Sequence, residues 1–182
     1  MEDSENIKFL DFLETVNLIN NDLTGGILGN ADFCFVNSKI LHPENTLPWS
    51  TPLFYTAFFS IGFVINARGV IIVDKEPCAL KPGILFINKP GELQQLSWET
   101  ISESYGLWFT EDFINKYAGI SIYETFPFLL FERHIPLNTS PEFQKELKKI
   151  ILQIVSELQK NTALKNKFCA NLLTRFLLKI NQ

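Results

Sequence analysis

The sequence predicts a mainly β domain, a strand sandwich or barrel, followed by a two-helix hairpin. Two observations predict the β part: aromatic residues make up 13% of the chain, and short apolar stretches alternate with Pro-Gly turns. The hairpin is predicted because apolar residues recur at steps of three and four after residue 140. With 182 residues, the chain is long enough for one substantial domain and an appendage.

Residues 1–30 are predicted to form a helix and an arm ahead of the β domain. Apolar residues recur at helical spacing from Ile7 to Ile19, and Ser4 is the expected cap. Segment 20–30 is rich in Gly and Asn, which predicts a loop.

Residues 31–136 are predicted to form the β domain itself. Asp32–Lys39 is expected to be a strand, and segment 42–52 a loop because it holds three prolines. Leu53–Asn66 is expected to be one long strand or two consecutive strands: every odd position is apolar or aromatic and the even positions are mixed, as in a half-buried strand. The shorter strands expected after a turn at 67–69 are 70–74, 84–88, 93–98 and 104–109.

Residues 137–182 are predicted to form the hairpin, after a short helix that Thr110 caps and Gly119 ends. Ser140 is the expected cap of the first hairpin helix, whose apolar stripe runs from 143 to 158. A second stripe runs from Leu164 to Ile180.

Composition bounds the classes of function. Residues 1–140 carry 8 Lys or Arg against 17 Asp or Glu, and residues 141–182 carry 8 against 3, so an acidic body precedes a basic tail. An acidic body does not bind nucleic acid by itself; the tail is either a solvated helix face or lies near DNA. No apolar run approaches the length of a membrane span, and three widely spaced cysteines indicate reduced thiols in a cytoplasmic protein.

Catalytic signatures are missing from the sequence. His42 and His134 lie far apart, with no second ligand at a metal-binding spacing. No nucleophile or phosphate-binding motif occurs. We therefore expect no catalytic residue, no metal and no cofactor, and a protein that is not an enzyme.

The best candidates for ligand binding follow Pro90-Gly91. Gln94, Leu96 and Trp98 share one face of a strand, where an amide, an aliphatic group and an indole could orient and enclose a small molecule. Alternatively, Leu96 and Trp98 are plain core and Gln94 faces water. Secondary candidates, for which core packing is the competing interpretation, are Tyr55, Phe35, Trp49 and Trp108.

The order of these segments resembles a known family. FFSIGFVIN, ARG, VIIVDKEPCALKPGILFINKPGELQQLSW, YGLWFTEDFINKY and a basic two-helix unit follow one another as in the N-terminal half of AraC-type transcriptional regulators. The resemblance runs from about Phe33 to Ile180, and its most specific parts are LKPGILFINKPGELQ and GLWFTEDFI. The family often has His where Gln94 stands, so a His-mediated ligand contact is not expected here.

The resemblance implies a cupin-like jelly roll that senses a small-molecule effector, and a helical hairpin that forms a homodimer. Contact with DNA would come only through helix-turn-helix units, which we expect to lie beyond Gln182. The second helix would supply the dimer interface through Leu164, Phe168, Leu172, Leu173, Phe176 and Ile180. Both helical stripes could instead dock on the barrel. The competing classes are a stand-alone cupin-type binding protein or metal-free cupin enzyme, and a protein-interaction domain with a filled barrel.

Overall fold

The computed structural model describes residues 8–19, 26–130 and 136–181. Ser4, segment 20–25 and His134, on which parts of the sequence prediction rest, lie outside these ranges. The described strands are β1 (Lys8–Leu10), β2 (Ile27–Gly29), β3 (Phe33–Asn37), β4 (Trp49–Ser50), β5 (Phe54–Thr56), β6 (Phe59–Val73), β7 (Glu76–Leu80), β8 (Ile84–Asn88), β9 (Leu93–Phe109) and β10 (Leu137–Asn138). The described helices are α1 (Phe12–Ile19), α2 (Ser38–Leu41), α3 (Glu111–Ala118), α4 (Ile122–Thr125), α5 (Pro141–Leu158) and α6 (Lys165–Ile180), with 3-10 turns at Glu44–Thr46 and Pro127–Leu130.

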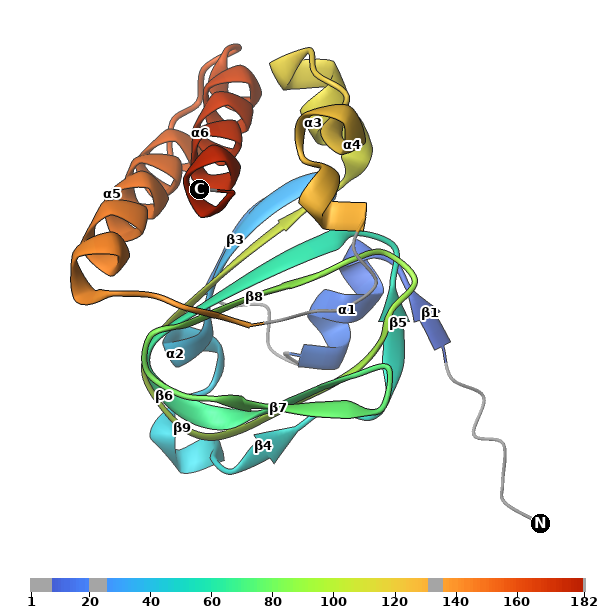
Figure 1. The fold of residues 1–182 in the computed structure, drawn as a ribbon, viewed down its shortest axis with the longest axis vertical. Helices are drawn as coiled ribbons and strands as arrows, with labels where there is room; N and C mark the ends of the chain where they lie inside the picture. The colour runs from blue at the N-terminus through green and yellow to red at the C-terminus, as the bar shows by residue number, and fades with distance from the viewer. Residues whose placement is uncertain (1–7, 20–25, 131–135, 182) are drawn as a thin grey trace.

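The barrel is built on two long antiparallel strands, β6 and β9, which pair from Phe59–Phe109 to Val73–Gln94. Register shifts between Val64 and Gly69 bend the pair, as β-bulges do. The other edge of β6 pairs with β8 along its first half and with β7 along its second half. The other edge of β9 pairs with β3, β4 and β5, so the sheet curls around an interior. The predicted fold class, a mainly antiparallel barrel followed by two helices, is confirmed (Figure 1).

Helices α3 to α6 gather on one side of this barrel (Figure 1). The odd-numbered residues of β6 in its first half, Phe59, Ile61 and Phe63, are buried in one cluster with residues of α5 and α6. The even-numbered residues Ser60 and Gly62 line the interior instead. Leu53–Asn66, predicted as one long strand or two, is thus β5 followed by the start of β6. Along residues 59–63, helices cover the apolar face and the mixed face looks into the barrel.

The predicted helix caps are also found. The backbone N–H of Phe113 donates to Thr110 Oγ1 at 3.2 Å, and Gly119 ends α3 with φ +71°. The backbone N–H of Phe143 donates to Ser140 Oγ at 3.2 Å, which caps α5.

The N-terminal helix begins later than predicted. Residues 8–10 form β1, which pairs parallel with β5. The helix begins after Asp11, whose N–H donates to Glu14 Oε2 at 3.0 Å while the Glu14 N–H donates to Asp11 Oδ1 at 2.9 Å. This reciprocal pair is a capping box with Asp in place of Ser or Thr. The predicted loop at 20–30 holds β2 at its end, and the predicted loop at 42–52 holds β4.

The predicted turn at 67–69 is wrong, because β6 continues through it to Val73. Gly69 makes this possible: a Cβ there would overlap the carbonyl oxygen of Ser97, so β9 can approach closely only because the side chain is missing. The chain reverses at Asp74 and Lys75 instead, with φ +49° and +72°. By the same continuity, the strands predicted at 93–98 and 104–109 are one strand, β9.

Candidate functional site

The interior wall of the barrel is built from short rows of residues that cross β8, β6 and β9. One row is Asn88, Ser60 and Trp108, and the next is Phe86, Gly62 and Gly106. Because directly paired residues point to the same face of a sheet, each row presents three neighbouring groups to the interior. Gly62 leaves room that the Phe86 ring occupies, since a Cβ there would overlap that ring, whereas a Cβ on Gly106 would meet Val36.

Four uncharged polar side chains form a hydrogen-bonded network on this wall. Asn88 Nδ2 donates to Ser60 Oγ at 3.2 Å and to Gln94 Oε1 at 2.9 Å. Gln94 Nε2 in turn donates to Thr56 Oγ1 at 3.0 Å, and the Thr56 hydroxyl donates to the carbonyl of Phe58 at 3.2 Å. All four side chains are buried, so the network fixes their orientation.

Two buried polar atoms on the cavity-lining residues have no hydrogen-bond partner within the described part of the chain: Asn88 Oδ1, an acceptor, and Trp98 Nε1, a donor. Leaving such a group unpaired in a protein interior costs about 1–3 kcal/mol. The cavity measures about 70 Å³, enough for a few water molecules or part of a small organic molecule. The pair of unpartnered atoms is thus suited to a guest that both donates and accepts.

The predicted ligand residues divide into two groups. Gln94, Leu96, Trp98 and Trp108 line the cavity. Phe35 lies in the cluster under the helices, beside Tyr105 at 5.6 Å between ring centroids. Trp49 packs on His42 with centroids 4.0 Å apart, and Tyr55 lies on β5; neither is among the residues lining the cavity.

Asn88, Ser60 and Thr56 are the site residues that sequence reasoning missed. Ser60 and Thr56 stood at the mixed positions of a predicted half-buried strand, and that alternation was the only signal for them. Asn88 ends the ILFIN segment beside a Pro-Gly turn, where an Asn is ordinarily a turn residue. Only the pairing of β8 with β6 places its side chain inside the barrel.

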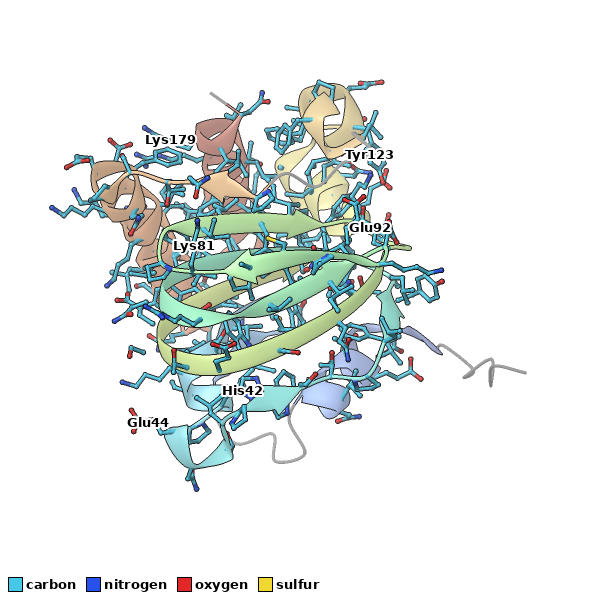
Figure 2. The ribbon with its side chains drawn as sticks, turned by 60° about the horizontal axis from the view of Figure 1, so that its bottom comes forward. His42, Glu44, Lys81, Glu92, Tyr123 and Lys179 are labelled. Atoms are coloured by element: carbon cyan, nitrogen blue, oxygen red, sulfur yellow. The ribbon has the colours of Figure 1, made fainter. Side chains whose placement is uncertain are left out.

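Among the residues that the structure describes, those lining the cavity include no Asp, Glu, Lys, Arg or His. Among residues 8–19, 26–130 and 136–181, no three His, Cys, Asp or Glu side chains gather as metal ligands would. His42 lies on the far side of the barrel from Tyr123 and Lys179 of the helical layer (Figure 2). Burial lowers the pKa of His42 to about 4, so its ring is neutral at neutral pH.

The predicted dimer residues have very different exposures. Leu164 and Phe168, one helical turn apart, are 56% and 52% exposed. Leu172 and Ile180 are half-buried, whereas Leu173 and Phe176 are fully buried against α3 and α5 within the same chain. These last two cannot touch a partner while the hairpin keeps this packing, so they leave the predicted interface. Leu152 on α5, 53% exposed, is a further apolar residue on the surface.

These features define a class: a β barrel with a polar-walled interior cavity and a helical layer packed on its outer face. The structure is similar to the AraC-like transcriptional activator CuxR, with 13% identity, a TM-score of 0.46, and 81% of this chain and 52% of that chain covered. It is also similar to a ToxT variant from Vibrio cholerae in its apo form, at 10% identity and TM-score 0.49, covering 84% and 57%. A third similar structure is an RmlC-like cupin from Shewanella frigidimarina, at 14% identity and TM-score 0.36, covering 48% and 78%.

Both kinds of protein named by the sequence resemblance are therefore among the structural neighbours. The chain spans just over half the length of the first two proteins. No family profile and no curated protein matches the sequence. In the described part of the chain, no helix is both long and apolar enough to cross a membrane.

Proposed function

We propose that the barrel binds a small uncharged effector and that the chain is the sensing part of an AraC-type transcriptional regulator. The observation that carries this proposal is the pair of unpartnered polar atoms, Asn88 Oδ1 and Trp98 Nε1, on residues that line one cavity. Burying these two atoms without partners only destabilises a protein that binds nothing. A ligand that hydrogen-bonds to both atoms would restore the lost stability. The effector is uncharged because an ion in this cavity would lose its hydration without meeting a counter-charge.

Communication with the hairpin would use the contacts between the barrel and α5. Glu103 of β9 accepts a hydrogen bond from the Tyr105 hydroxyl at 2.9 Å and forms an ion pair with Lys148 of α5. Burial, together with this Glu103 contact, raises the pKa of Tyr105 to about 12, so the hydroxyl stays a donor. A ligand that shifted β9 would alter these contacts and would thereby change how the hairpin packs on the barrel.

Self-association through the hairpin is the second half of the proposal. The exposed pair Leu164 and Phe168 begins α6 with apolar surface that no described element covers. A homodimer formed there would place two hairpins together, and DNA would be contacted only through further units outside this chain. The whole would act in the cytoplasm and without catalysis.

Thermal-shift screening against uncharged hydroxyl- and amide-bearing metabolites tests the binding proposal. A true effector raises the melting temperature, because it binds the folded state only. Trp98→Phe, which removes the unpartnered donor, should weaken binding by about tenfold. Trp49→Phe, the same exchange at the β4 residue that pairs with Trp98, removes no cavity-lining group and should weaken binding less than Trp98→Phe. If the stabilising compounds were instead converted to products, the competing cupin-enzyme class would be favoured.

A further inference from the structure

A second and larger hollow lies on the side of the barrel, between β7 and β8. These two strands follow the same edge of β6 and are joined by the turn at 81–83, where the ribbon bends (Figure 1). The hollow, here called the side cleft, measures about 470 Å³. Lys81 marks the turn between the two strands, and Glu92 lies beyond the opposite end of β8 (Figure 2).

The side cleft and the interior cavity share a wall. Ile71, Phe86 and Asn88 line both. Ile71 and Asn88 are buried, whereas Phe86 is half-buried and its ring rests against Gly62. Phe86 is therefore the least buried of the three shared residues, and its ring lies over a glycine.

The chemistry of the side cleft changes from its rim to its inner end. Asp74, Glu76 and Lys81 stand among its lining residues, and Ile84, Ile87 and Pro77 supply apolar surface. At the inner end, Asn88 is 2% exposed and its Oδ1 atom has no partner. An acceptor in that position calls for a donor group on whatever fills the space.

We propose that the effector enters through the side cleft, with Phe86 as the gate. On this reading the ligand has an apolar body, which lies against Ile84 and Ile87, and a terminal hydroxyl or N–H group, which donates to Asn88 Oδ1. The inference rests on the proposed function, since both need a ligand inside the barrel. It goes further by fixing the route, the gate and the group that is recognised.

Cys78 makes the route measurable. It lies opposite Ile71 in the β6–β7 pair and lines the side cleft, partly exposed. The other two cysteines of the sequence, Cys34 and Cys169, are both within the described residues and both buried. N-ethylmaleimide should therefore modify Cys78 first, and the rate of that reaction reports whether the side cleft is occupied.

The probes are two isomers, hexan-1-ol and 1-methoxypentane, which share a formula but differ in having a hydroxyl donor. Millimolar hexan-1-ol should slow alkylation of Cys78 and shift the indole N–H resonance of Trp98. The ether should need about a tenfold higher concentration, because it cannot donate to the buried acceptor. Asn88→Leu should abolish the difference between the isomers. Ser60→Ala, which removes a neighbour of Asn88 but leaves Oδ1 in place, should preserve it.

Each failure has a distinct meaning. If hexan-1-ol shifts the Trp98 indole while Cys78 reacts at its free rate, the barrel binds ligands by another route and the gate proposal is wrong. If both isomers bind equally well, the role of Asn88 Oδ1 is wrong. If hexan-1-ol changes neither the alkylation rate of Cys78 nor the Trp98 indole signal, the inferred ligand class is wrong. If in addition no metabolite in the screen shifts the Trp98 indole, the proposed function is wrong as well. Phe86→Ala checks the gate separately, since it should speed the approach to binding equilibrium.

Discussion

Replacing Gln94 and Asn88 by leucine, singly and together, tests the interior network and its unpartnered atom. Gln94→Leu removes the acceptor at 2.9 Å from Asn88 Nδ2 and the donor at 3.0 Å from Thr56 Oγ1. Asn88 then keeps only the 3.2 Å bond to Ser60, and Thr56 keeps its bond to the Phe58 carbonyl. Asn88→Leu also breaks two bonds, but it removes the unpartnered Oδ1 as well.

The magnitudes follow from this difference. Depriving buried groups of a partner costs about 1–3 kcal/mol, and the added apolar surface of leucine returns about 1 kcal/mol, so Gln94→Leu should destabilise by about 1–2 kcal/mol. Asn88→Leu should cost less, close to zero, because the unpaired acceptor no longer has to be buried. The double variant should cost less than the sum of the single ones by about 1 kcal/mol, the coupling expected for residues in one network.

Urea denaturation followed by circular dichroism measures all four proteins, and the linear extrapolation gives each free energy of unfolding. A chain of this size should lose about 2–4 °C in Tm for each kcal/mol. Additive costs would mean that the 2.9 Å contact between the two side chains contributes nothing. A larger loss for Asn88→Leu than for Gln94→Leu would mean that Oδ1 has a partner, and the argument for a ligand would lose its basis.

Three other predictions concern the hairpin, the bend and the acid range. Phe168→Glu should convert a dimer to a monomer in sedimentation without loss of helicity. Leu173→Glu should instead unfold the hairpin, because it buries a charge. A Phe168→Glu protein that stays dimeric would show that the Leu164–Phe168 surface is not the dimer interface. Gly69→Ala should lower the melting temperature several times more than Gly91→Ala, because a Cβ at 69 overlaps backbone atoms, whereas at 91 only the φ of +82° opposes a side chain. Equal losses would show that Gly69 is not needed for the close approach of β6 and β9. Burial lowers the pKa of His42 from 6.5 to about 4, so between these values the unfolded chain binds one more proton and the free energy of unfolding falls as the pH drops. His42→Phe should remove this part of the pH dependence in urea titrations. An unchanged dependence of the unfolding free energy on pH would contradict the assignment to His42.

The sequence reveals those elements whose signals are local. Thr110, Ser140 and Gly119 act through their own backbone neighbours, so the caps and the end of α3 could be predicted. The two faces of the Leu53–Asn66 segment could be predicted for a similar reason, since burial of one face leaves a period of two. The capping box of α1 is also local, but Asp11 stands where the usual pattern has Ser or Thr, so the sequence pattern alone does not mark it.

What the sequence could not supply depends on partners far along the chain. ARG at 67–69 has the composition of a turn, but pairing with β9 keeps it extended, and Gly69 serves close approach rather than reversal. Asn88 and Ser60 are 28 residues apart and meet only through the register of β8 on β6. The helical stripe of α6 identified its apolar face correctly, but whether Leu173 faces its own chain or a partner depends on the packing of α3 and α5.

The central claim is that a ligand enters this barrel and pairs with groups that the protein itself leaves unpaired. Proton–nitrogen correlation spectra of labelled protein test it directly, because the three tryptophans give three indole signals that Trp98→Phe and Trp49→Phe assign. A compound that stabilises the protein should move the Trp98 indole signal by more than that of Trp49, the β4 residue that pairs with Trp98 but does not line the cavity. Stabilising compounds that move only the Trp49 signal would locate binding outside the barrel and contradict the account.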